Sequence, residues 1–322
     1  MSGLIAACGP VEPGRRKLVG LWIWVLLSLL ALTQTGEDGK LPISSDLLLY
    51  QIDQAAGVTT LAVGPDGCIA SGGQDWAVRL WDPMGEELGI LPVDGTLIAV
   101  EFLDGLLVAV TAAGTVWWWS VQVGSPPSRF SVYTPQIERT AREGGQVSTS
   151  APVTAAAVNR ELKLVAIGSR DGVVRLWTLD GKRWGVLPGA GGMITALAFS
   201  PNGRVLAAAA AGKGVWVWNL ADRQAVRVLE GASAPLAFSP DGTTLVVGAG
   251  GIVKLWDLVG WGVRHSFSAP SPITAVAFHS SGEFLAGGAS DGSVWLWDFG
   301  TGTRLEIFPA PGEVTAIVLS IL

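Results

Sequence analysis

The stretch VRLWD at Val78–Asp82 returns in close copies along most of this chain of 322 residues. The later copies read VWWWS, VRLWT, VWVWN, VKLWD and VWLWD, and the tryptophan that closes each copy stands at an equivalent place. Four of the five intervals between successive tryptophans are 38 or 41 residues and one is 58, and a period near 40 indicates a unit of four short strands. The repeating tryptophans are Trp81, Trp119, Trp177, Trp218, Trp256 and Trp297.

Each copy lies in the same succession of strand and turn signals. An apolar stretch such as ITALAF at 194–199 precedes a turn such as SPNG at 200–203, and the tryptophan lies in the second apolar stretch after that turn. Proline presets φ at the first corner of such turns, and glycine tolerates the positive φ at the far side. A more polar stretch such as QAVRVLE at 224–230 completes the unit. The pattern therefore predicts a four-stranded antiparallel meander.

The composition supports an all-β protein with a large core. Hydrophobic residues make up 49% of the chain and charged residues 15%, and 43 glycines accompany 15 tryptophans, as expected for short packed strands joined by tight turns. A formal net charge of −6 provides no broad basic surface for phosphates, so we expect no nucleic-acid partner. The only cysteines, Cys8 and Cys68, define no disulfide framework.

The repeat resembles the WD40 family, in which Trp-Asp closes the third strand of each blade of a β-propeller. Trp-Asp is present at 81–82, 256–257 and 297–298 and becomes Trp-Ser, Trp-Thr or Trp-Asn in the other copies. The resemblance implies six recognisable four-stranded blades plus an incomplete seventh over residues 47–322. It also implies that the repeating indoles wedge neighbouring blades together, and that a structural aspartate occupies the turn before the third strand in three blades: Asp75, Asp171 and Asp291.

The chain departs from this family in two respects. Family members often begin each repeat with Gly-His, whose histidine joins a buried network with an aspartate, a hydroxyl and the tryptophan, but His265 and His279 stand elsewhere. We therefore expect hydrophobic packing to hold the ring. The end of the chain, VTAIVLSIL, begins a further repeat, and LLLYQI at 47–52 suits an outermost strand. Either a seventh blade consists of these two strands and lacks the two between them, or the chain is a truncated product of a longer protein.

The amino-terminal region predicts a membrane segment. Arg15, Arg16 and Lys17 precede an uncharged apolar run, and acidic residues follow it. We expect a basic cytoplasmic segment at 1–17, a transmembrane helix or signal region at 18–33 and a linker at 34–46, with the propeller held outside the cytoplasm. A cleaved, secreted form, a buried helix and a mistaken start site stay open as alternatives.

The long interval between Trp119 and Trp177 predicts an insertion loop at about 135–152. Outer-to-inner connections emerge on the face of a propeller where the channel mouth is usually used for binding, so this loop is a candidate partner contact, and a loop without a partner is the alternative. The candidate binding residues are Glu138, Arg139, Arg142 and Glu143.

The residues favour a non-catalytic scaffold. The chain contains no nucleophile elbow, zinc-protease motif, phosphate loop or calcium loop, so we expect no catalytic residue, metal or cofactor. We predict a scaffold for protein–protein interaction whose partners are other proteins, with membrane contact through the amino-terminal helix. The alternative is an extracytoplasmic propeller enzyme of lactonase or quinoprotein-like type, which needs polar ligands converging on the axis.

Overall fold

The computed structural model describes residues 2–8, 47–52, 57–64, 67–82, 86–122, 131–133, 151–179, 181–187, 190–310 and 312–321. These residues form strands, turns and bends, and contain no helix long and apolar enough to cross a membrane. The apolar segment at 18–33 lies outside them, as do the linker and most of the insertion loop.

Six four-stranded sheets repeat one meander, and we call them blades 1 to 6. Blade 1 contains β3 (Val58–Val63), β4 (Ile69–Gly73), β5 (Ala77–Trp81) and β6 (Glu87–Pro92). Blade 2 contains β7 (Leu97–Leu103), β8 (Leu106–Thr111), β9 (Val116–Gln122) and β10 (Ser131–Tyr133). Blade 3 contains β11 (Val153–Asn159), β12 (Leu164–Ser169), β13 (Val174–Thr178) and β14 (Arg183–Leu187).

The remaining blades follow the same order. Blade 4 contains β15 (Ile194–Phe199), β16 (Val205–Ala210), β17 (Gly214–Asn219) and β18 (Gln224–Leu229). Blade 5 contains β19 (Ser233–Phe238), β20 (Thr244–Ala249), β21 (Ile252–Asp257) and β22 (Val263–Ser268). Blade 6 contains β23 (Ile273–Phe278), β24 (Phe284–Ala289), β25 (Ser293–Asp298) and β26 (Arg304–Pro309). The seventh sheet contains β27 (Val314–Ile321), β1 (Ser2–Cys8) and β2 (Leu47–Ile52).

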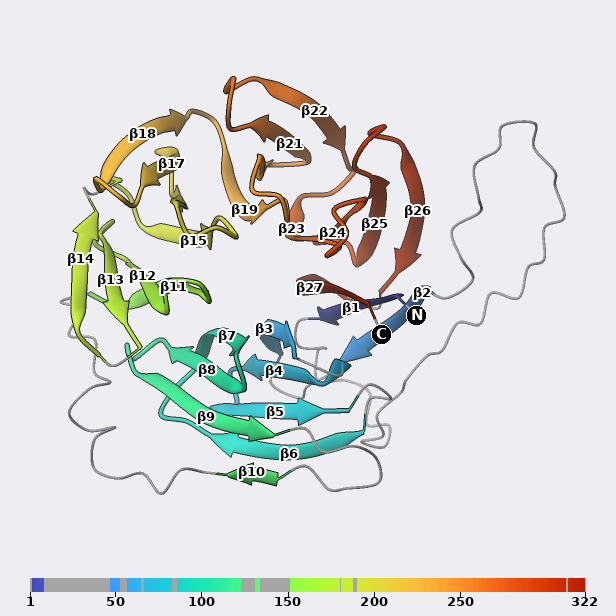
Figure 1. Cartoon of the computed structure of the whole chain (residues 1–322). Coiled ribbons are helices and arrows are strands. Elements are labelled where there is room, and N and C mark those ends of the chain that lie inside the picture. Colours follow the sequence, from blue (N-terminus) through green and yellow to red (C-terminus); the bar gives the residue numbers. More distant parts are fainter. Residues whose placement is uncertain are drawn as a thin grey trace, which may run out of the picture.

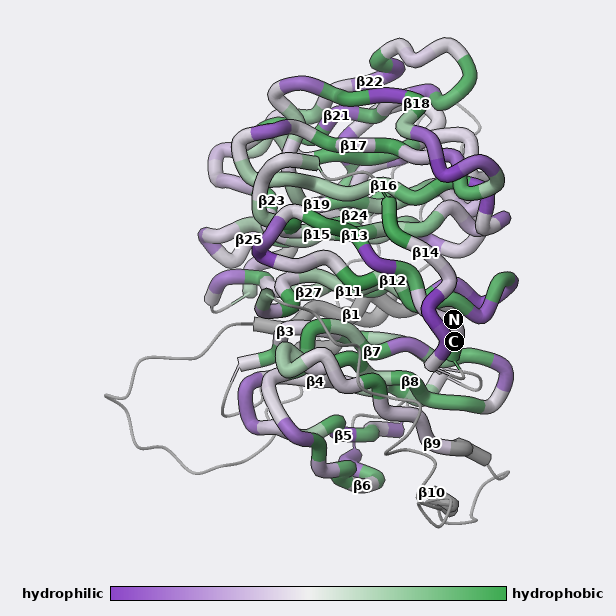
Figure 2. The backbone as a smooth tube through the Cα atoms, turned by 90° about the vertical axis from the view of Figure 1, so that its left-hand side faces the viewer, coloured by the Kyte–Doolittle hydropathy of each residue, from purple (hydrophilic) through white to green (hydrophobic). Residues whose placement is uncertain are grey.

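The sheets succeed one another around a ring, with the first strand of each blade innermost (Figure 1). The predicted all-β propeller with six four-stranded blades is therefore confirmed. The second strand is the most buried element of a blade, and green, hydrophobic segments run through the stacked sheets (Figure 2). It is covered on both faces, which is why it reads as a nearly continuous run of apolar and small residues.

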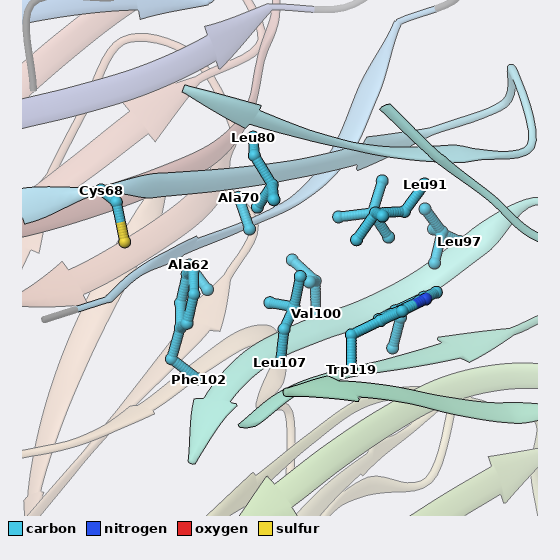
Figure 3. Close-up of a cluster of buried hydrophobic side chains, with 12 residues drawn as sticks. Ala62, Cys68, Ala70, Leu80, Leu91, Leu97, Val100, Phe102, Leu107 and Trp119 are labelled. Carbon is cyan, nitrogen blue, oxygen red and sulfur yellow. The ribbon is translucent and has the colours of Figure 1, made fainter. Parts of the chain in front are cut away.

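The seams before blades 2, 4, 5 and 6 follow one rule. The repeating tryptophan of each of these blades packs against the aliphatic residues one and three places before the tryptophan of the preceding blade, whereas Trp177 of blade 3 packs with Val116 and Trp118, and Trp81 of blade 1 with Ala316 and Val318. Trp119 meets Val78 and Leu80, and Trp218 meets Val174 and Leu176. Figure 3 shows Leu80 and Leu91 of blade 1 in one cluster with Trp119 of blade 2. The indoles of Trp119 and Trp218 thus lie between neighbouring blades.

Glycine and threonine complete three of the seams. A Cβ added to Gly288 in β24 would lie 2.3 Å from a methyl carbon of Val314, so only glycine lets the next sheet approach this closely. The hydroxyl of Thr274 donates to the Val314 carbonyl at 2.5 Å and to the Gly288 carbonyl at 3.1 Å. The same arrangement joins Thr59 and Gly72 to Leu97, and Thr154 and Gly168 to Ile194.

The seventh sheet joins the two ends of the chain. β27 is its innermost strand and β1 pairs antiparallel with it, while β2 pairs parallel with β1. The hydroxyl of Thr315 in β27 donates to the Val58 carbonyl of blade 1 at 2.6 Å, which links the last repeat to the first. The innermost and outermost strands predicted for this sheet are both present.

Strand β1 corrects the sequence analysis in one respect. The incomplete seventh blade was expected to lack both middle strands, and Ser2–Cys8 supplies one of them, between β27 and β2. The cytoplasmic location expected for residues 1–17 stays a prediction. The physical reason is that SGLIAAC is apolar enough to serve as an internal strand, and β27 leaves an edge to be paired.

Candidate interaction surfaces

The structure places the six repeating tryptophans in the third strands of blades 1 to 6. Trp81, Trp119, Trp218 and Trp297 are buried, and Trp177 and Trp256 are half-buried. Trp119 and Trp218 contact the seam residues described above.

The turn aspartates organise one face of the ring. The Arg79 guanidinium donates to the Asp75 carboxylate at 3.0 Å, and Arg175 donates to Asp171 at 2.8 Å. The hydrogen bond from Arg175 is the main reason why the pKa of Asp171 is lowered. Asp291 accepts from the backbone of Ser293 and from the hydroxyls of Ser293 and Ser271, and these bonds lower its pKa as well. All three carboxylates lie in turns between second and third strands, and Asp291 also binds Ser271 in the turn before β23.

Asp94 is a structural residue that the sequence analysis did not identify. It stands at the start of a repeat, where family members often carry histidine, and it accepts hydrogen bonds from Thr111 (3.0 Å), Thr115 and the indole of Trp117 (3.1 Å). Partial burial alone would raise the pKa of Asp94, but these hydrogen bonds lower it overall. The signal that could have revealed it is the pairing of Asp-Gly with two threonines flanking the next turn, at 111 and 115.

In three of the six blades the N–H of the repeating indole lacks the hydroxyl partner that blade 1 provides. Trp81 donates to Ser71 at 2.8 Å. The buried N–H groups of Trp177, Trp218 and Trp256 have no hydrogen-bond partner. Residues equivalent to Ser71 are Ile167, Ala208 and Val247, which stand opposite Arg175, Trp216 and Lys254 and have no acceptor. The expectation that packing and not a polar network holds the ring is met in these blades.

The two histidines have separate structural roles. His265 stacks on Phe267 with ring centroids 6.3 Å apart. His279 is buried at a turn, where its Nδ1 lies 2.7 Å from the Ser281 hydroxyl, and burial lowers its pKa. No group of three or more His, Cys, Asp or Glu that could hold a metal ion occurs within the residues that the structure describes.

The insertion loop cannot be placed. Glu138, Arg139, Arg142 and Glu143 lie outside the described residues, so their predicted role in binding stays a prediction.

A basic surface with aromatic platforms lies on the outer side of blades 3 to 5. The Arg223 guanidinium sits 4.3 Å from the ring centre of Trp184, and that of Arg227 sits 5.9 Å from the ring centre of Trp261. Each pair joins neighbouring blades, because Arg223 directly precedes β18 and Arg227 lies within it, while Trp184 is in β14 and Trp261 precedes β22. We call this surface the arginine–tryptophan surface, and we count with it exposed Arg183, which precedes Trp184 in β14, and exposed Arg204, whose backbone carbonyl accepts from the N–H of Leu220 near Arg223.

The arginines of this surface differ from the ion-paired ones. Arg79, Arg160, Arg175 and Arg264 each have a carboxylate within 4.0 Å. By contrast, none of the four arginines of the arginine–tryptophan surface forms an ion pair with any described residue. A guanidinium over an aromatic face keeps its N–H donors available to a further acceptor. The surface is therefore chemically suited to an anionic group.

A single carboxylate interrupts the apolar inner strands. Glu101 in β7 stands where the inner strands of blades 1, 3, 4, 5 and 6 have alanine. Its side chain is exposed to solvent, yet protein atoms surround the carboxyl group closely enough to desolvate it. Desolvation within this enclosure raises the pKa of Glu101 to about 7, against a smaller opposing effect of Arg160. Arg160 itself donates to the Phe102 carbonyl at 2.8 Å and lies 3.9 Å from Asp104.

Comparison with known proteins agrees with this architecture. The family model described as WD domain, G-beta repeat matches residues 48–82, 144–178, 181–219, 226–257 and 261–298, which together make up more than half of the chain.

Three curated relatives are similar over parts of the chain. The U3 small nucleolar RNA-associated protein 21 homolog of Schizosaccharomyces pombe is 27% identical over 69% of this chain and 24% of its own length. Eukaryotic translation initiation factor 3 subunit I of Aspergillus fumigatus is 29% identical over 46% of this chain and 50% of its own length. Telomerase protein component 1 of Rattus norvegicus is 32% identical over 46% of this chain and 6% of its own length. The chain thus spans half or less of these relatives, and by its repeats and its ring of blades it belongs to the WD40 family.

Proposed function

We propose that this protein is a non-catalytic scaffold whose arginine–tryptophan surface binds an acidic segment of a partner protein. The observation that carries the proposal is the set of exposed arginines that form no ion pair within the described part of the chain, on a protein whose net charge is −6. Two of them are held over indole rings, so little side-chain freedom is lost when they bind. Charged side chains at the rim of an interface mainly affect the association rate and the specificity of binding.

The relatives support the coarse part of this proposal. One is named as a subunit of a translation initiation factor, one as a protein component of telomerase and one as an RNA-associated protein. These names describe assemblies, and a rigid ring of blades gives an assembly a surface of fixed shape. In the finer form of the proposal the insertion loop also contacts the partner, through Glu138, Arg139, Arg142 and Glu143.

The test measures binding of a fluorescent decaglutamate peptide to the full chain. We expect saturable binding that weakens as salt rises, and at least tenfold weaker binding by the Arg183→Glu/Arg227→Glu variant. Arg170→Glu is the matched control, because Arg170 is exposed and without an ion pair but lies in the turn between β12 and β13. Equal losses in both variants, or preference for a single-stranded RNA of the same charge, would overturn the assignment.

The membrane-anchored, extracytoplasmic placement predicted from the sequence is a separate hypothesis. Strands β1, β2 and β27 share one sheet, and a single uncleaved span at 18–33 would separate β1 from the other two. A carboxyl-terminal fusion to a reporter that is active only outside the cytoplasm tests the placement, and an inactive reporter on a stable fusion refutes it.

A further inference from the structure

Trp76 is the one exposed tryptophan among the described residues. Its side chain is 59% exposed, whereas the other described tryptophans are buried or half-buried. It lies in the turn between β4 and β5 of blade 1. A single exposed apolar side chain is common on protein surfaces, so exposure by itself assigns no role to this ring.

The backbone of Trp76 makes this indole unusual. Its φ of +58° lies in the left-handed region, which bulky residues rarely adopt. The strand registers align this turn with those of blades 2, 3 and 6, where the equivalent residues are glycines with φ of +84°, +78° and +87°: Gly114, Gly172 and Gly292. Blade 1 thus carries the largest side chain at a place where three other blades carry none.

The hydrogen bonding of the turn does not require the indole. The N–H of Val93 donates to the Trp76 carbonyl at 2.9 Å, just as Ala190 donates to Gly172 at 3.1 Å in blade 3. A glycine at position 76 would make the same bond without backbone strain. The indole is therefore held in solvent at a cost to the fold, and residues kept in such conformations cluster at functional sites.

Other indole rings of the chain are covered by its own arginines. The Arg223 guanidinium lies 4.3 Å from the ring centre of Trp184, and that of Arg304 lies 5.3 Å from the ring centre of Trp295. No arginine or lysine of the described part of the chain makes such a contact with Trp76. The ring of Trp76 is accordingly open to a cation from another molecule.

The residues next to Trp76 carry an excess of negative charge. The Arg79 guanidinium lies 3.0 Å from the Asp75 carboxylate and 2.8 Å from that of Glu87, so these three side chains together keep one negative charge. Asp94, which follows Val93 in the chain, adds an exposed carboxylate. A cation over the indole is attracted by the face of the ring and also by these carboxylates.

We propose that Trp76 is the contact point for an arginine side chain of a partner protein, whose guanidinium stacks on the indole beside Asp75 and Asp94. Arginine suits this place because its planar guanidinium stacks on aromatic faces and still donates to carboxylates at its edge. Tryptophan is also the side chain most typical of binding hot spots, together with tyrosine and arginine.

This site is separate from the arginine–tryptophan surface. Strands β4 and β5 lie across the ring from β18 and β22 (Figure 1). The two places also select groups of opposite charge, so binding of an acidic segment at one and of an arginine at the other are independent properties. Either proposal can fail without the other.

The test measures binding of a fluorescent peptide that contains three arginines separated by glycine and serine. We expect the full chain to bind it about tenfold more tightly than the same peptide with citrulline in place of arginine. Trp76→Gly should weaken binding of the arginine peptide about tenfold and leave the melting temperature at or above that of the wild type, because glycine relieves the strain. Trp76→Asn should act in the same direction, since asparagine tolerates the left-handed conformation.

Ile252→Ala is the matched control. Ile252 is 41% exposed and lies at the end of the corresponding turn of blade 5, so this variant also removes exposed apolar surface and should bind like the wild type. Equal affinity of the wild type and Trp76→Gly, equal losses in Trp76→Gly and Ile252→Ala, or equal binding of the citrulline peptide would overturn the proposal. A lower melting temperature in both Trp76 variants would also overturn it, because the indole would then serve the fold.

Discussion

At the scale of single residues, the acceptor of the indole N–H is the feature that varies most between blades. Ser71 accepts from Trp81, whereas the buried N–H of Trp218 has no partner because Ala208 stands at the equivalent place. A buried donor left unsatisfied costs about 1–3 kcal/mol. The position that Ser71 holds in blade 1 and Ala208 holds in blade 4 therefore contributes more to the stability of blade 1.

This difference predicts opposite effects for two substitutions. Ser71→Ala should lower the free energy of unfolding by about 1–3 kcal/mol, because it leaves the Trp81 N–H unsatisfied. Ala208→Ser should raise it by about 1 kcal/mol by giving Trp218 an acceptor. Urea unfolding followed by tryptophan fluorescence measures both. A loss of stability in Ala208→Ser would show that the hydroxyl cannot reach the ring.

Glu101 gives the protein a pH dependence with a defined sign. Its pKa is raised to about 7 in the folded state, so the folded state binds the proton more tightly than the unfolded state. The stabilisation is fully present below the unfolded pKa of about 4.5 and is lost as pH rises toward 7. Because the side chain retains contact with solvent, we expect a loss of only about 1 kcal/mol. The Glu101→Gln variant should not show this loss when unfolding is compared at pH 5 and pH 8, and parallel curves for the two proteins would contradict the prediction.

At the scale of elements, the seams depend on threonine hydroxyls of the inner strands. Thr154 reaches across to the Ile194 carbonyl of blade 4 at 2.5 Å, whereas Thr195 donates at 3.3 Å within its own blade. Thr154→Val should therefore cost about 1 kcal/mol or more, since it leaves a carbonyl of the seam without its partner. Thr195→Val is the control of equal chemistry and should cost less. Equal losses in chemical denaturation would show that the hydroxyl adds nothing at the seam.

At the scale of the whole molecule, the ring depends on strands from both chain ends. β1 pairs along nearly the full length of β27, and β27 contacts blade 1 through Thr315. Deletion of residues 2–8 should leave the edge of β27 unpaired, which favours association between chains. We expect a lower melting temperature and concentration-dependent oligomers in light scattering. A monomeric deletion variant with an unchanged melting temperature would show that β1 is dispensable.

The sequence by itself determined the repeat, the strand order within a blade and the positions of the wedging indoles. These follow from short-range periodicity: a strand covered on both faces must be apolar along its length, and Trp177 or Trp218 is recognised by its neighbours in the chain. The turn aspartates could be predicted for the same reason, because Asp171 and Asp291 bind groups within a few residues or in the adjoining turn.

Only the tertiary structure decided which distant residues meet. The place of Ser2–Cys8 beside β27, the pairing of Arg227 with Trp261 and the enclosure of Glu101 depend on how separate blades are arranged around one axis. No local pattern encodes these contacts, because each is formed by residues from different repeats. The free energy that selects them comes from burying the seams together, which happens only when the ring is complete.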